Sequence, residues 1–92
     1  MIKKIDPTLI EKVKSVPIEN FLPPSRHHRN NGYQMYSCPF HEDRKPSLAV
    51  YTKNNSFYCF SCGRHGDNIT FIMELCKASF KEAVEFLEKH EH

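Results

Sequence analysis

Cys38-Pro39-Phe40-His41 and Cys59-Phe60-Ser61-Cys62 are the two stretches that decide the fold of this 92-residue chain. In each, two metal-ligating side chains are separated by two residues, so a tight turn can direct both at one ion while intervening backbone N–H groups point at the thiolates. Three thiolates and one imidazole complete a tetrahedral Zn²⁺ site. The spacing therefore predicts a zinc ribbon, in which a hairpin-length connection joins two knuckles.

The predicted ligands are Cys38, His41, Cys59 and Cys62, holding one structural Zn²⁺. His65 lies three residues after Cys62 and is an alternative to His41. A catalytic zinc is disfavoured, because the four ligands leave no open position for water. A zinc deaminase needs His-x-Glu and Pro-Cys-x-x-Cys, whereas Glu42 directly follows His41 here. Buried free thiols are the remaining alternative, and they leave His41 without a role.

The size of the chain favours a single domain that needs its metal. A chain this short buries only about 60% of its unfolded surface, so a bound ion would supply stability that the core lacks. Hydrophobic residues make up 39% of the sequence, which is compatible with a folded core.

No apolar run approaches the roughly 20 residues of a membrane span, and no signal peptide is present, so we expect a cytoplasmic protein without a membrane partner. Thiols there stay reduced, which favours metal over disulfides.

Charge is distributed unevenly along the sequence. Residues 1–66 hold ten Lys/Arg against five Asp/Glu, a net +5, whereas residues 67–92 hold three against six, a net −3. The formal total is +2, and three thiolates with one Zn²⁺ lower it to about +1. A polyanionic partner should therefore meet the ribbon half.

The elements before the hairpin follow from proline and turn chemistry. Asp6 and Pro7 begin a short helix that ends near Ser15, and Pro17 begins a second short turn, so 7–22 is read as two short N-terminal helices. Strands are predicted at 33–37, 47–52 and 56–60, with a turn at 53–55 between the last two. The ribbon thus occupies 33–66.

Two helices complete the chain over 67–90. Asp67 caps the first, whose apolar face is predicted to contain Ile69, Ile72, Met73 and Cys76, with Cys76 as a core thiol rather than a ligand. A Ser79–Glu82 capping box opens the second, with a predicted inward stripe of Phe80, Ala83, Val84 and Leu87. The predicted fold class is α+β: one domain, residues 1–92, with a zinc ribbon on a small antiparallel sheet flanked by short helices.

Aromatic and basic residues alternate through the ribbon. Exposed aromatics beside cations form a stacking platform for single-stranded nucleic acid; the alternative is that half of the rings point into the core and the charges are merely solvated. The aromatic residues are Tyr33, Tyr36, Tyr51, Phe57, Tyr58 and Phe60. The candidate DNA contacts are Arg26, Arg29, Arg44, Lys45, Lys53, Tyr58, Phe60 and Arg64.

These motifs resemble the CHC2-type zinc-binding domain at the N-terminus of bacterial and phage DNA primases. The matching segments cover nearly the whole chain: Cys38-Pro39-Phe40-His41, Lys45-Pro46-Ser47, the stretch 57–63, Gly66-Asp67, and the helical segments 69–73 and 79–87. The resemblance implies the same four zinc ligands, binding of the single-stranded DNA template, and a role in initiating RNA primer synthesis. It also implies a neighbouring polymerase domain that makes the primer with carboxylate-bound metal ions; this chain has no such catalytic centre.

Three functional hypotheses follow. The first is the DNA-binding zinc domain of a primase, excised from a longer chain or encoded alone by a phage or mobile element. The second is an accessory zinc ribbon that docks on a polymerase or the replicative helicase, with Glu74, Glu82, Glu85 and Glu88 as its working surface. The third, a stand-alone enzyme, is disfavoured because the sequence shows no carboxylate cluster or nucleophile–base pair.

Overall fold

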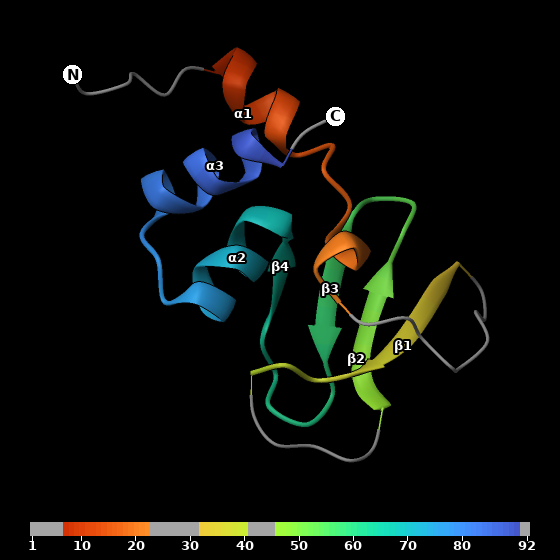
Figure 1. Ribbon diagram of the computed structural model, residues 1–92. Coiled ribbons are helices and arrows are strands. Elements are labelled where there is room, and N and C mark those ends of the chain that lie inside the picture. Colours follow the sequence, from red (N-terminus) through yellow and green to blue (C-terminus); the bar gives the residue numbers. More distant parts are fainter. Residues whose placement is uncertain (1–6, 23–31, 41–45, 91–92) are drawn as a thin grey trace.

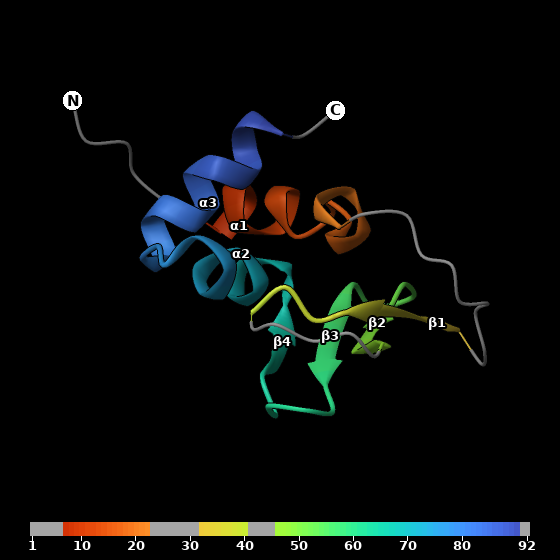
Figure 2. The ribbon, with the colours of Figure 1, turned by 60° about the horizontal axis from the view of Figure 1, so that its bottom comes forward.

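A four-stranded antiparallel sheet forms one layer of the molecule, and helices lie to one side of it (Figure 1, Figure 2). The computed structural model describes residues 7–22, 32–40 and 46–90. The strands are adjacent in chain order: β1 (Tyr33–Ser37), β2 (Pro46–Tyr51), β3 (Ser56–Cys59) and β4 (His65–Asp67). The helices are α1 (Pro7–Val13), the 3-10 helix η1 (Ile18–Phe21), α2 (Asn68–Cys76) and α3 (Phe80–Lys89). The predicted α+β class is confirmed.

Strand register separates a buried face of the sheet from an exposed one. Leu48 lies opposite Cys59, and Val50 lies opposite Phe57, on neighbouring strands. Directly opposed residues of an antiparallel pair share a face, and these four side chains are buried in the core. Phe71 of α2 joins them, with its ring 5.3 Å from that of Phe57. The helices therefore cover the face that carries Leu48, Val50, Phe57 and Cys59.

The first three strands match their predicted positions within one residue. The turn between β2 and β3 needs a left-handed residue, which Asn55 supplies with φ of 53°. Strand β4 was not among the predicted elements. This strand has only three residues, includes Gly66, and pairs with β3 along a single edge, so it has no hydrophobic alternation to signal it.

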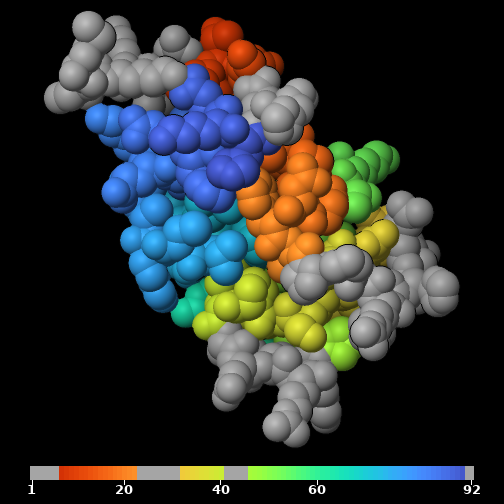
Figure 3. Space-filling view, viewed as in Figure 1, coloured from red at the N-terminus to blue at the C-terminus, as the bar shows by residue number. Residues whose placement is uncertain are grey.

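The N-terminal helices pack against the C-terminal helix. Pro17 precedes η1 with extended backbone, φ −65° and ψ 137°, as expected for a residue that ends one helical segment and begins another. The ring of Phe21 lies 5.5 Å from that of Phe86 on α3. Figure 3 shows the resulting contact, with η1 in orange beside α3 in dark blue. The two predicted N-terminal helical segments are confirmed.

Side-chain caps fix both C-terminal helices as predicted. Asp67 Oδ1 accepts a hydrogen bond from the Thr70 N–H at 2.9 Å, and the Ser79–Glu82 capping box has both of its bonds. Lys77 is left-handed, with φ of 55°, and its N–H bonds to the Met73 carbonyl oxygen at the end of α2. None of the helices in the described ranges has the length and apolarity required to span a bilayer.

Two predicted core residues are exposed instead. Cys76 is the last residue of α2, and its thiol faces solvent because no further helical turn follows to cover that side. Phe71 occupies the core from the same helix. Phe80 is 47% exposed at the first position of α3. Helical side chains tilt toward the N-terminus, so this ring projects beyond the start of its helix.

Candidate metal centre

Three cysteine thiols converge where the ends of the strands meet. The sulfur atoms of Cys38, Cys59 and Cys62 all lie within 4.8 Å of one another. In a tetrahedral site with Zn–S bonds of about 2.3 Å, neighbouring sulfur atoms are about 3.8 Å apart. Sulfur atoms within 4.8 Å of one another are compatible with that spacing, so the cluster suits a single Zn²⁺. His41 lies outside the described residues, so its predicted role stays a prediction.

Strand pairing explains why the thiols meet. Leu48 on the central strand lies opposite Tyr36 on one side and Cys59 on the other, and Cys38 follows the end of β1. The second knuckle closes through a hydrogen bond of 2.8 Å from the Gly63 N–H to the Cys59 carbonyl oxygen. Gly63 has φ of +80°, a conformation that glycine adopts without steric cost. The hairpin therefore returns the second knuckle to the first.

The electrostatics of the cluster favour a bound cation. Cys38 and Cys59 are buried, and burial raises the pKa of the Cys38 thiol to about 12, with the neighbouring Cys59 and Cys62 adding to the shift. The Phe40 N–H donates a hydrogen bond to the Cys38 sulfur, as the knuckle geometry predicts. This bond acts to lower the pKa of the Cys38 thiol, against the effect of burial. Several thiols this close can be thiolates together only when a cation offsets their charge. The donor set is therefore suited to a thiophilic metal ion.

His65 does not belong to the thiol cluster. Its Nδ1 lies 3.0 Å from the Gly63 carbonyl oxygen, so that nitrogen carries the proton and donates it. Its ring stacks on Tyr58, with centroids 5.8 Å apart and planes 24° apart. Both contacts place His65 on the exposed side of β4. The structure gives no support to His65 as an alternative ligand to His41.

Aromatic side chains gather on the sheet face away from the helices. The rings of Tyr58 and Phe60 are 5.1 Å apart, and those of Tyr33 and Tyr51 are 5.5 Å apart. Tyr58 is 39% exposed and Phe60 is 62% exposed. We call Tyr33, Tyr51, Tyr58, Phe60 and His65 the aromatic face. Tyr36 and Phe57, by contrast, are buried in the core, so two of the six aromatic residues point inward, and not the half that the alternative required.

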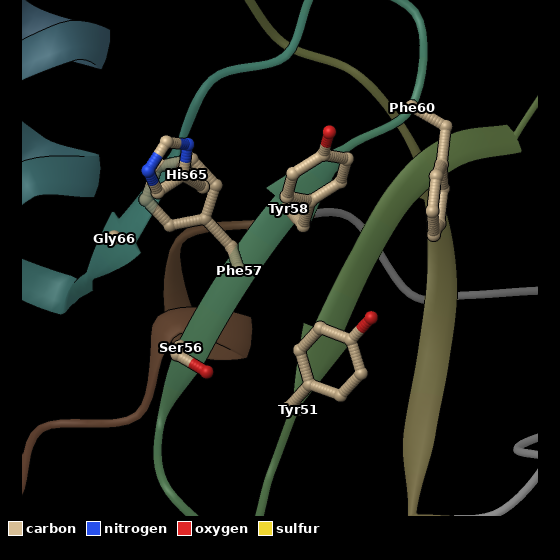
Figure 4. Close-up of a pocket in the computed structure, with 7 residues that line it drawn as sticks. All are labelled: Tyr51, Ser56, Phe57, Tyr58, Phe60, His65 and Gly66. Carbon is tan, nitrogen blue, oxygen red and sulfur yellow. The ribbon is translucent and has the colours of Figure 1, made fainter.

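An open hollow of about 470 Å³ lies on this face (Figure 4). Figure 4 shows the rings of Tyr51, Tyr58 and Phe60 projecting from neighbouring segments. The hollow is lined by Tyr51, Ser56, Phe57, Tyr58, Phe60, His65 and Gly66. The size and the aromatic lining suit a flat, unsaturated ligand.

The family model of the CHC2 zinc finger matches residues 7–92. This chain belongs to the CHC2 zinc finger family. It is a zinc-binding domain of the type found in DNA primases, and the thiol cluster is the part of the metal site that the structure describes.

Curated relatives of this CHC2 zinc finger are DNA primases. The DNA primase of Chlamydia trachomatis is 47% identical over 55 residues, which are 60% of this chain and 9% of that protein. The DNA primase of Synechococcus elongatus is 52% identical over 52 residues, 56% of this chain and 8% of that protein. The chain thus matches less than a tenth of the length of each.

A solved structure agrees with the fold. The Aquifex aeolicus primase, comprising zinc-binding and RNA polymerase domains, superposes with a TM-score of 0.75 at 27% identity. The match covers 95% of this CHC2 zinc finger and 22% of the Aquifex chain.

The candidate DNA contacts divide into two groups. The structure describes Lys53, Tyr58, Phe60 and Arg64. It does not describe the other four, which are Arg26, Arg29, Arg44 and Lys45. Lys53 is exposed in the turn after β2. The Arg64 side chain is paired with Glu74, so the CHC2 zinc finger already provides it with a partner. Sequence reasoning missed His65 as part of the aromatic face, because only its pairing with Tyr58 across β3 and β4 reveals its position.

Proposed function

We propose that this CHC2 zinc finger binds the single-stranded DNA template of a primase and helps to select where RNA primer synthesis begins. The observation that carries this proposal is the hollow of the aromatic face, with the exposed rings of Tyr58 and Phe60 at its rim. Bases of a single strand stack on such rings whatever their sequence, because every base has a π-face. Buried rings of the same sheet, such as Phe57, are not available for this contact.

Charge supports the same partner. The half of the chain that contains the ribbon carries a net +5, and Lys53 is exposed in the hairpin turn that follows Tyr51. A protein that neutralises phosphates releases counterions, so binding should weaken steeply as salt rises. Arg26, Arg29, Arg44 and Lys45 remain proposed contributors from the same half of the sequence.

The proposed metal site comprises Cys38, His41, Cys59 and Cys62 around one structural Zn²⁺. The converging thiols support three of the four ligands. A bound Zn²⁺ would supply rigidity and folding free energy, with no open position for catalysis. The chain itself positions the site, because β1 and β3 lead into the two knuckles. The knuckles in turn hold the edge of the aromatic face beside Phe60.

The proposed setting is a longer replication protein. The Aquifex structure joins its zinc-binding domain to an RNA polymerase domain, which supports a primase polymerase domain as partner of this chain. We propose that primer synthesis itself belongs to that separate domain, and that the replicative helicase is a further partner. In this proposal residues 1–92 act as one domain in the cytoplasm, with helices in 7–22, the ribbon in 33–66 and helices in 67–90.

The accessory-docking hypothesis has weaker support. It requires Glu74, Glu82, Glu85 and Glu88 as a working surface. Glu74 pairs with Arg64 at 2.9 Å, and Glu82 closes the capping box of α3. Glu74 and Glu82 are thus engaged within the chain, which favours the DNA-binding proposal.

The decisive experiment measures binding of the zinc-loaded chain to fluorescein-labelled single-stranded DNA by anisotropy at low salt, alone and fused to a primase polymerase domain. Tyr58→Ala and Phe60→Ala should each weaken binding by about fivefold to 150-fold, because stacking of one base contributes about 1–3 kcal/mol. Phe80→Ala is the matched control, since Phe80 is an equally large exposed ring on α3, away from the sheet. It should leave affinity unchanged.

Lys53→Ala should make the dependence of log affinity on log salt less steep, by the amount expected for the loss of about one phosphate contact. Lys89→Ala, at the end of α3, should leave this slope unchanged. The proposal is wrong if the fused, zinc-loaded chain shows no DNA binding at low salt. Equal affinity for the Tyr58, Phe60 and Phe80 variants would instead move the binding surface away from the aromatic face. If charge reversal at Arg44, Lys45 and Lys53 leaves DNA affinity unchanged, docking on a protein partner is favoured.

A further inference from the structure

Arg64 connects the second knuckle to α2 through three contacts. Its Nε donates a hydrogen bond of 2.9 Å to Glu74 Oε1. Its guanidinium carbon lies 5.6 Å from the centre of the Phe40 ring, within the range of a cation–π contact. The guanidinium also hydrogen-bonds to the side chain of Cys62. One cation thus touches a thiol of the metal cluster, the first knuckle and a helix.

Cys62 differs from the other two thiols of the cluster. Cys38 and Cys59 are buried, whereas Cys62 is exposed to solvent. An exposed thiolate on zinc can be approached by water and by electrophiles unless a neighbouring side chain shields it. Within the described part of the chain, Arg64 is the cation recorded in hydrogen-bond contact with Cys62.

The planar guanidinium suits this position. It has five N–H donors in a rigid fork, so one edge can bond to a carboxylate while another donates to sulfur. Three thiolates, a neutral imidazole and Zn²⁺ together carry a charge of about −1, which one adjacent cation offsets. Glu74 and the Phe40 ring restrict the rotamers of Arg64, so little entropy is lost when it contacts Cys62.

We propose that Arg64 is a positioning residue of the zinc site, which donates a hydrogen bond to the Cys62 sulfur, offsets the negative charge of the site and shields this exposed ligand. The proposal rests on Cys62 being a zinc ligand, as proposed above. Groups that touch ligands from outside typically change metal affinity by about 10- to 100-fold when they are removed. Arg64 therefore serves the metal site in addition to any contact with DNA.

The test compares Arg64→Gln, Arg64→Lys, Glu74→Gln and the control Lys89→Gln in the zinc-loaded chain. Zinc affinity is measured by competition with a chromophoric chelator, and alkylation of each cysteine by iodoacetamide is mapped by mass spectrometry. Arg64→Gln should weaken zinc binding by about 10- to 100-fold and accelerate alkylation of Cys62 more than that of Cys38 or Cys59. Glu74→Gln should act in the same direction but less, and Lys89→Gln should have no effect.

Arg64→Lys separates charge from geometry, because lysine keeps the charge but cannot bridge sulfur and carboxylate. It should give an intermediate effect, and it keeps the test informative if Arg64→Gln does not fold. The proposal is overturned if the Arg64 variants lower only the melting temperature, with zinc affinity and Cys62 alkylation unchanged. Cys62→Ser distinguishes this result from failure of the ligand assignment: if Cys62→Ser leaves zinc affinity intact, Cys62 is not a ligand and the role of Arg64 falls with it.

Discussion

The Asn55 side chain donates a hydrogen bond of 2.8 Å from Nδ2 to the carbonyl oxygen of Val16, 39 residues earlier in the sequence. The same Nδ2 bonds to the Lys14 carbonyl oxygen at 2.8 Å, and Oδ1 accepts from the Ile18 N–H at 3.0 Å. Asn55 thus satisfies three backbone groups between α1 and η1 while it forms the left-handed position of the hairpin turn. A single side chain joins the N-terminal helices to the ribbon.

Asn55→Gly should destabilise the domain by about 2–3 kcal/mol, because three hydrogen bonds of about 1 kcal/mol each are lost while the turn conformation is kept. Urea unfolding of the zinc-loaded chain measures this change. Asn54→Gly, at the neighbouring exposed position, removes only the contact from the Ser56 hydroxyl and should cost less than 1 kcal/mol. Equal losses in the two variants would contradict a special role for Asn55.

Gly66→Ala should be far more disruptive than Gly32→Ala. Both glycines have positive φ, +146° and +85°, so alanine strains either position. Only at Gly66 would the added Cβ meet another side chain, at 2.7 Å from Thr70 Cβ. Strain and overpacking each cost about 1–3 kcal/mol, so we expect a loss of about 3 kcal/mol at Gly66 and about 1 kcal/mol at Gly32. Thermal unfolding would show the difference, and similar melting temperatures would refute it.

Removal of zinc should unfold the domain, because metal affinity is folding free energy in a domain this small. Chelation, followed by circular dichroism and urea titration, should abolish the cooperative transition, and added Zn²⁺ but not Mg²⁺ should restore it. A chain that keeps its thermal midpoint after complete zinc removal would disprove the structural role.

The exposed cysteines provide a matched pair for the ligand assignment. Cys62 belongs to the thiol cluster, whereas Cys76 lies at the end of α2 outside it. Cys62→Ser should lower zinc affinity by at least tenfold, whereas Cys76→Ser should leave it unchanged, as measured by chelator competition. An equal effect of both substitutions would contradict the assignment.

Acid should weaken the capping box of α3. The hydrogen bond from the Ser79 backbone N–H lowers the pKa of Glu82 from its usual value of 4.5. A carboxylate whose pKa is lowered by folding contributes stability above its unfolded-state pKa, and this contribution is lost as pH falls through the folded-state pKa. Glu82→Gln keeps an acceptor but does not titrate. The difference in melting temperature between wild type and Glu82→Gln should therefore shrink below pH 4.5, and a constant difference would count against this coupling.

Strong local signals made most of the fold predictable. Pro7, Asp67 and Ser79 have fixed roles at helix starts, and the alternation around Leu48 and Val50 gives the strand and its buried face. The cysteine spacing predicted the thiol cluster. These features depend on neighbours within a few residues, so they can be read from the sequence directly.

The features that were predicted wrongly or not at all depend on tertiary contacts. Helix α2 is apolar on much of its surface, so its periodicity did not distinguish Phe71, which is buried, from Cys76, which is exposed. The pairing of Arg64 with Glu74 joins residues on separate elements, and no spacing rule predicts it. Strand β4 forms only because β3 offers it an open edge. Each of these features depends on how elements meet.

Leu48 lies opposite Tyr36 on one side and Cys59 on the other, so zinc binding depends on the register of these strands. A slip of one residue in the pairing of β1 would move Cys38 by about 3.3 Å and turn its side chain to the opposite face. The three sulfur atoms would then no longer surround one point. Zinc would bind only the correctly aligned sheet. The ion would therefore stabilise the correct register of β1 over the slipped one during folding.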